Sequence, residues 1–211
     1  MEADRDHTAV GSDWIWELRV PTGAEPALRE LYALAAERDL RTVDDPHVAL
    51  AAMATGRENG QLWTNDDIDI FVNWENGTLV WALDAAFCHR RPVPEADTFR
   101  ELHARLTSLW LDVARRLNAD AGRVLDEWSS EQVWHLGIHE AIHPAGGWPA
   151  ELGWWTYLGP DHHRPAPPLP EVATRARPMP NGALLVTLLD DPAAVDALRY
   201  EDIHTRWLQA A

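Results

Sequence analysis

The chain has 211 residues and contains no lysine, a single cysteine and four serines. Without lysine it cannot supply the lysine of a phosphate-binding P-loop, the Schiff-base lysine of a pyridoxal-phosphate enzyme or a Ser–Lys dyad. None of its serines stands in G-x-S-x-G, and G-x-G-x-x-G is missing as well. Because Cys88 is alone, no internal disulfide and no thiolate zinc cluster can form. Several large enzyme classes are therefore excluded.

Long apolar runs are also missing. No stretch approaches the roughly 20 residues that a membrane-spanning helix requires. The first residues, MEADRDHTAVGSDW, are charged and lack the apolar region of a secretion signal. We therefore expect a cytoplasmic protein that does not enter a membrane.

Negative charge and tryptophan, by contrast, are abundant. The formal net charge is −16 at pH 7, and the chain carries 12 tryptophans. An acidic surface repels phosphate groups, so nucleic acid and anionic membranes are not expected as partners. The same surface attracts a basic protein and speeds its association, and tryptophan is enriched among the residues that dominate binding energy. The composition therefore favours a protein that holds a positively charged protein.

Alternation and helical spacing predict the elements of the first 125 residues. Residues 14–20 alternate between apolar and polar types, as in a half-buried strand. Helices are predicted over 26–38 and 97–118 from their apolar stripes, and a shorter helix over 45–56 from its start and stop signals.

Residues 66–83 carry the clearest pattern, two alternating runs joined by Asn76-Gly77. Asn-Gly is typical of a two-residue type I′ turn in a β-hairpin. The turn predicts a register in which Trp74 lies opposite Leu79, Val72 opposite Trp81 and Ile70 opposite Leu83. Asp67, Asp69 and Asn73 are predicted on the other face of the hairpin.

The last third of the chain mixes turn signals with short apolar runs. It predicts a helix over 129–142 that begins at a Ser-x-x-Gln capping box, followed by a strand over 153–158. A second strand over 172–179 contains prolines, which places it at a sheet edge, and Asn-Gly at 181–182 predicts a hairpin turn. A C-terminal helix is predicted to begin at Asp191, which is followed by proline.

The order of the elements predicts an α+β fold, with antiparallel-rich sheets, Asn-Gly hairpins and covering helices. A strand, a hairpin and a helix recur in both halves, which is compatible with two similar lobes, 1–125 and 126–211. A single sheet covered by helices, within one domain, fits the same order.

One segment matches a catalytic motif, because His139-Glu140-Ala141-Ile142-His143 is H-E-x-x-H. In zinc proteases the two histidines bind the metal and the glutamate activates its water. Pro144 disfavours the helical conformation of His143, which would separate the two imidazoles. In the longer pattern of these enzymes the third ligand position is occupied by Pro149. A zinc-dependent hydrolase is therefore the alternative hypothesis, and our prediction is no metal, no cofactor and no catalytic residue.

Two segments, GWPAELGWWTYLG at 147–159 and NGALLVTLLDDPAAVDALRY at 181–200, resemble the immunity protein 52 family of bacterial polymorphic-toxin systems. The resemblance covers about residues 140–211 and includes a G-x-W motif, which Gly153-Trp154-Trp155 and Gly146-Gly147-Trp148 both satisfy. It implies an α+β protein without catalytic activity, encoded beside a toxin that it neutralises by binding. In this family the toxin is often a nuclease.

Contact residues are predicted where carboxylates or tryptophans stand in turn-rich sequence. A nuclease binds DNA through a basic surface, so carboxylates would meet its Lys and Arg side chains while tryptophans act as anchors. Tryptophans at periodic positions are expected in the core instead. The predicted partner-binding set is Asp66, Asp67, Asp69, Trp74, Glu75, Trp148, Trp154 and Trp155.

Overall fold

The computed structural model describes residues 12–42, 60–64, 68–84, 94–138, 148–161 and 166–210. Within these ranges nine strands form one sheet: β1 (Trp14–Arg19), β2 (Arg41–Thr42), β3 (Gly60–Trp63), β4 (Asp69–Glu75), β5 (Thr78–Leu83), β6 (Ala121–Asp126), β7 (Trp155–Leu158), β8 (Ala176–Pro178) and β9 (Leu184–Thr187). Their order is β2-β3-β4-β5-β1-β6-β7-β9-β8, and every neighbouring pair is antiparallel. The sheet is therefore continuous across both halves of the chain, which meet where β1 pairs with β6.

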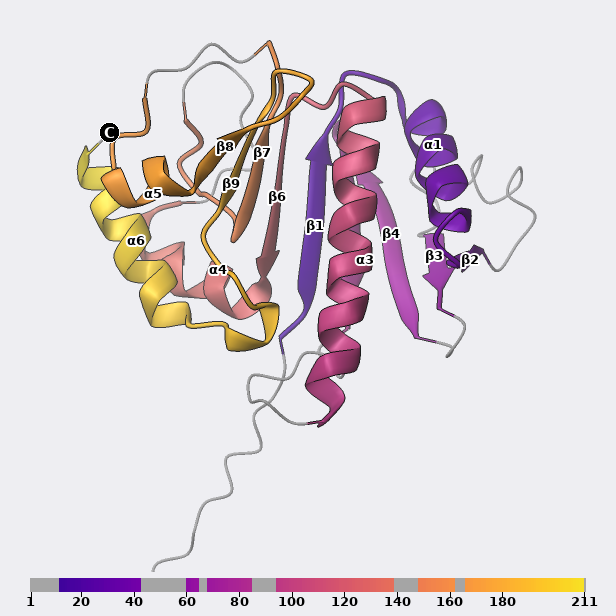
Figure 1. Cartoon of the computed structure of the whole chain (residues 1–211), viewed down its shortest axis with the longest axis horizontal. Helices are drawn as coiled ribbons and strands as arrows, with labels where there is room; N and C mark the ends of the chain where they lie inside the picture. Colours follow the sequence, from indigo (N-terminus) through magenta and orange to yellow (C-terminus); the bar gives the residue numbers. More distant parts are fainter. Residues whose placement is uncertain are drawn as a thin grey trace, which may run out of the picture.

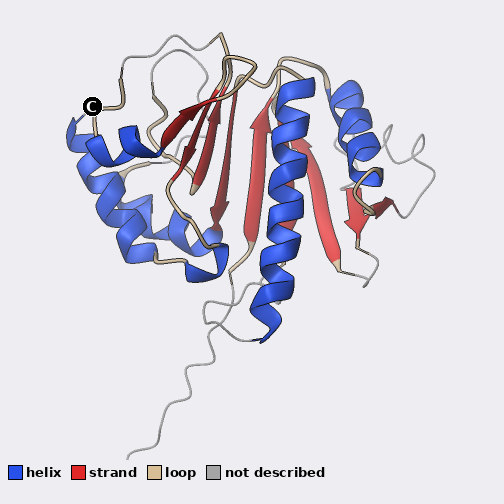
Figure 2. Ribbon diagram, in the orientation of Figure 1, coloured by secondary structure: helices blue, strands red, loops and turns tan. Residues whose placement is uncertain are grey.

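The helices that the structure describes form two groups. They are α1 (Ala24–Ala36), α3 (Pro94–Arg116), α4 (Glu127–Val133), α5 (Pro170–Arg175) and α6 (Ala197–Ala210), with the 3-10 helices η2 (Trp134–Leu136) and η3 (Pro192–Ala194). Helices α1 and α3 cross in front of the sheet in Figure 1, and α4, α5 and α6 gather toward its β8 end. Figure 2 shows the same separation of helices and strands, which confirms the predicted α+β class. None of the helices in the described ranges is long and apolar enough to cross a membrane.

The β4–β5 hairpin has the predicted register. Trp74 pairs with Leu79, Val72 with Trp81 and Ile70 with Leu83. The turn residues Asn76 and Gly77 have φ values of 49° and 82°. A type I′ turn requires positive φ at both central positions, and Asn-Gly adopts it with little strain.

Helix α3 covers the face of β1 that carries Trp14, Trp16 and Leu18, all of which are buried. Trp16 Nε1 donates a hydrogen bond to Thr107 Oγ1 at 3.0 Å. Trp110 Nε1 donates to the backbone oxygen of Glu17 at 2.9 Å. The predicted strand and long helix are thus present, and their tryptophans lie in the core as expected.

Strand β6 has no counterpart among the sequence predictions. Its sequence, AGRVLD, lacks polar alternation because every residue except Arg123 is buried. Helix α4 then begins at Asp126, whose Oδ1 accepts a hydrogen bond from the Ser129 backbone N–H at 3.1 Å, and it ends at Val133. The prediction that Ser129 caps this helix is therefore wrong, because Asp126 supplies the capping oxygen.

Two further predictions near the C-terminus are corrected. Residues 172–179 form the end of α5 and the short edge strand β8, because Pro170 starts a helix before the strand. Asp191 Oδ1 accepts from the Ala193 backbone N–H at 3.0 Å and caps η3, while α6 begins only at Ala197. The helix predicted over 45–56 lies outside the described residues.

The two halves of the sheet are covered differently. In β1 and β5, buried and partly exposed side chains alternate, so these strands bury one face only. In β6, by contrast, both faces are buried. Helix α3 packs on β6 on the side of Val124, which pairs with Trp16. On the Arg123 side, hydrogen bonds through Glu151 lead to Ser130 of α4 and Tyr200 of α6, and α4 and α6 pack on each other. The half of the sheet that contains β1, β5, β4 and β3 therefore has one face that no described helix covers.

Candidate functional site

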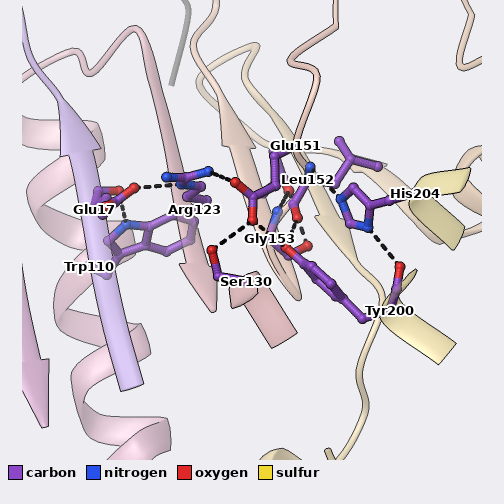
Figure 3. A network of polar contacts seen from close by, with 10 residues as sticks. Glu17, Trp110, Arg123, Ser130, Glu151, Leu152, Gly153, Tyr200 and His204 are labelled. Carbon is purple, nitrogen blue, oxygen red and sulfur yellow. Dashed lines mark hydrogen bonds and ion pairs between the residues drawn. The ribbon is translucent and has the colours of Figure 1, made fainter. Parts of the chain in front are cut away.

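Arg123 of β6 is the centre of a buried polar network (Figure 3). Its Nε donates to Glu17 Oε2 at 2.5 Å, and its Nη1 donates to Glu151 Oε2. The side chains of Arg123, Glu17 and Glu151 are 11%, 20% and 5% exposed. Burial alone would lower the pKa of Arg123, but the two carboxylates raise it above its ordinary value. The guanidinium thus stays charged between its partners.

The network continues into helix α6. Glu151 Oε1 accepts hydrogen bonds from Ser130 Oγ at 3.2 Å and from the Tyr200 hydroxyl at 3.3 Å. The same hydroxyl lies against the backbone oxygen of Leu152. Burial, and then the charge of Glu151, raises the pKa of Tyr200 well above its ordinary value. Tyr200 is therefore a neutral donor at the far end of the network.

His204 closes the network on the same helix. Its Nε2 accepts from the Leu152 backbone N–H at 3.0 Å, so its Nδ1 carries the proton and donates to the Tyr200 backbone oxygen at 2.8 Å. Burial lowers the pKa of His204, which agrees with this neutral form. These bonds fix α6 and the segment around Leu152 to the sheet, so the network is part of the scaffold.

The Gly153-Trp154 pair of the G-x-W motif is also structural. A Cβ at Gly153 would lie 2.6 Å from Trp155 O, 2.7 Å from Val124 O and 2.8 Å from Arg123 Cβ. Glycine is therefore what lets this segment lie directly on β6. Trp154 is 0% exposed, and its Nε1 donates to Asp126 Oδ2 at 2.9 Å and to Ser129 Oγ at 3.2 Å. The prediction that Trp154 is exposed for partner binding is wrong, because its indole is part of the core.

Trp155 belongs to an aromatic cluster under α3. It packs with Trp14 and His103 at ring-centroid distances of 6.0 and 4.8 Å, and Trp16 and Phe99 complete the surroundings of the imidazole. Burial lowers the pKa of His103 to about 3, although Asp191 acts in the opposite direction. His103 Nδ1 lies 3.4 Å from Thr107 Oγ1, and its Nε2 has no hydrogen-bond partner. Trp155, which is only partly exposed, thus has a packing role.

The structure does not bring the predicted contact residues together. Trp74 lies on the face covered by α1 and α3, where it packs against the core. Trp148, half-buried, makes an edge contact with Trp207 of α6 at 5.5 Å. Asp69 and Glu75 share the uncovered side of β4, whereas Trp74 and Trp155 lie on the opposite, α3-covered side of the sheet. Asp66 and Asp67 lie outside the described residues.

The uncovered face, hereafter the open face, is the feature that the sequence prediction missed. It consists of the odd-numbered side chains of β1, β3 and β4 and the even-numbered side chains of β5. Cross-strand pairing places Phe71, Ala82 and Ile15 in one row across three strands. Phe71 is 44% exposed. The alternation in 66–83 places Phe71 on the polar face of the hairpin, so the sequence could have indicated an exposed aromatic side chain there. The prediction of contact residues considered only the carboxylates of that face.

The H-E-x-x-H segment at 139–143 lies outside the described residues, so the alternative zinc site stays a sequence hypothesis. Among the residues that the structure describes, no group of three or more His, Cys, Asp or Glu side chains is arranged to hold a metal ion.

Comparison of the sequence with models of protein families and with curated proteins found no match in either case.

Proposed function

We propose that this protein is an immunity protein, which binds and neutralises a cognate polymorphic toxin that has a basic surface, a nuclease being the type best matched. The observation that carries the proposal is the distribution of charge over the described residues. Nine arginines already form ion pairs within the fold: Arg29, Arg38, Arg100, Arg115, Arg116, Arg123, Arg175, Arg199 and Arg206. Nine of the 13 arginines in the described ranges are thus paired within the fold.

Carboxylates remain in excess at the surface. Exposed acidic side chains without an ion pair in the described ranges include Glu37, Asp39, Glu75, Glu101, Glu127, Glu131 and Asp161. At the start of α4, burial and then the neighbouring Asp13, Glu131 and Asp126 raise the pKa of Glu127. Carboxylates that crowd in this way gain from a cationic partner, because it removes their mutual repulsion.

An acidic surface suits an inhibitor of a nuclease. The surface of a nuclease that meets DNA phosphates carries Lys and Arg, and an acidic protein competes for the same groups. Long-range attraction also raises the association rate, which falls as salt screens it. The sequence resemblance to the immunity protein 52 family supports the same proposal.

The test uses the polypeptide encoded directly upstream of this gene. Expressed alone in a bacterial host, it should arrest growth, and co-expression of the present chain should restore growth and yield a stable complex. Stopped-flow association should slow at least about tenfold between 50 and 500 mM salt. Charge reversal of Asp66 and Asp67 together should also slow association, and this effect should vanish at high salt. An upstream polypeptide that is harmless and does not bind the chain would refute the proposal.

A further inference from the structure

The open face combines an apolar row with unpaired carboxylates. The row is formed by Phe71, Ala82 and Ile15. Asp69 and Glu75 stand on the same strand as Phe71, and neither forms an ion pair with a described residue. An apolar centre beside polar groups is the usual composition of a protein–protein contact.

The contrast with the other half of the sheet indicates that the face suits a protein layer. On β6 the corresponding side of the sheet is sealed by α4 and α6, and Leu125, next to Ile15 in the pairing, is 2% exposed. Glu17 and Arg123 pair at the border between the sealed and the open half. Three adjacent strands of six or seven residues present a surface of about 15 by 20 Å, which is the scale of the central patch of a protein contact.

We propose that the open face is the docking surface for the basic toxin, with Phe71 as the apolar anchor and Asp69 and Glu75 as the groups that meet arginine or lysine. This inference rests on the proposed function and adds the place of contact. Phe71 is the large apolar side chain that this face exposes, and truncation of central aromatic residues has the largest effects in interfaces.

Charge complementarity selects a basic partner over a second copy of this chain. Because Glu17 is paired with Arg123, the described part of the face carries the carboxylates of Asp69 and Glu75 against the single cation of Arg19, and each whole chain has a net charge of −16. Two copies placed face to face would oppose carboxylate to carboxylate, which costs free energy. A cationic protein surface removes this repulsion.

The first experiment is a thiol footprint. In a Cys88→Ala background, Phe71→Cys places a thiol on the open face, and Trp134→Cys places a matched control on η2, where the native indole is 58% exposed. Both thiols should react quickly with a maleimide in the free protein. With the upstream-encoded polypeptide at ten times its Kd, about 90% of the chain is bound, so alkylation at position 71 should slow about tenfold. Alkylation at position 134 should keep its rate.

The second experiment measures affinity for the same polypeptide. Phe71→Arg and Glu75→Arg should each weaken binding at least about tenfold. The controls Trp134→Arg and Glu101→Arg change an exposed aromatic and an exposed unpaired carboxylate elsewhere, and they should weaken it less than about threefold. All four variants should keep the melting temperature of the wild type within about 3 °C, since the changes are on the surface.

The outcomes separate the two proposals. If the wild-type chain does not bind the upstream polypeptide, the proposed function fails and the docking surface fails with it. If binding is intact but position 71 is not protected and both open-face variants bind normally, only the docking surface is refuted. If the thiol at position 71 is already protected in the free monomer, a segment of this chain covers the open face. If the wild-type chain is a dimer that Phe71→Arg converts to a monomer, a second copy of the chain covers it. Either result overturns the inference.

Discussion

Replacement of Gly153 by alanine tests whether the G-x-W segment is part of the scaffold. The added Cβ would lie 2.6 and 2.7 Å from two backbone oxygens, those of Trp155 and Val124, and 2.8 Å from Arg123 Cβ. The two oxygens belong to strands β7 and β6, which pair with each other, so neither can move without disturbing the sheet. Overpacking of this kind costs about 1–3 kcal/mol, and rigid neighbours place Gly153→Ala near 3 kcal/mol.

Two other glycines provide matched controls for the same substitution. At Gly23 nothing lies within 4 Å of the added Cβ, so Gly23→Ala should change stability by less than about 0.5 kcal/mol. At Gly77 the space is also open but φ is +82°, so Gly77→Ala should cost about 1–2 kcal/mol from backbone strain alone. In thermal unfolding followed by circular dichroism, Gly153→Ala should melt about 6–12 °C below wild type for a chain of this size. A melting temperature equal to that of Gly23→Ala would refute the close approach of this segment to β6.

Two further predictions concern buried ionisable groups. Burial lowers the pKa of His103 to about 3, below the 6.5 of the unfolded chain, so its contribution to stability is complete above pH 6.5 and is lost as the pH falls toward 3. At 1.36 kcal/mol per pH unit, the free energy of unfolding should fall by about 2 kcal/mol between pH 6.5 and 5 because of His103. The variant His103→Leu should not show this loss. An imidazole NMR resonance of His103 that titrates near pH 6.5 would contradict the prediction. Arg123→Met leaves Glu151 buried without its cation and should destabilise the fold by about 3–5 kcal/mol in urea titration. The double variant Arg123→Met with Glu151→Gln should recover most of that loss, and equal stability of the single and double variants would argue against the buried pair.

The sequence predicted those elements whose local pattern agrees with their packing. The β4–β5 register followed from Asn76-Gly77 and from strict alternation, because one side of the hairpin is buried and the other is not. The long helix α3 followed from an apolar stripe that faces the sheet along its length. In both cases a single face is buried, which is the condition under which periodicity is informative.

Periodicity failed where both faces are buried or where capping depends on a distant partner. Strand β6 gave no alternation because the sheet is sealed on both sides at this position. Asp126 caps α4 and also accepts the Trp154 indole N–H, a contact between positions 28 residues apart that local patterns cannot reveal. The β2–β3 edge was missed because its strands have only two and four residues.

The exposure expected for the tryptophans of the contact set was predicted less well, for a related reason. Turn-rich sequence around Trp154 and Trp155 suggested exposure, but Gly153 lets the segment pack on β6 and places both indoles against the core. Composition could not separate a tryptophan that anchors a partner from one that anchors a helix. Asp69 and Glu75 were selected for their charge, and they share the open face because a strand places alternate residues on one side.

The open face follows from the order in which the chain supplies its described helices. Helices α1 and α3 come from the first half of the chain and cover the same face of the sheet, while α4 and α6 follow β6 and cover the opposite face of the second half only. The segments from which an immunity protein is predicted belong to that sealed half, where Gly153, Trp154 and Tyr200 are all buried. A motif that maintains the fold therefore says little about where a partner binds. A basic protein seated on β1, β5 and β4 would take the position over the first half that α4 and α6 have over the second, and it would neutralise carboxylates that the chain's own arginines leave unpaired.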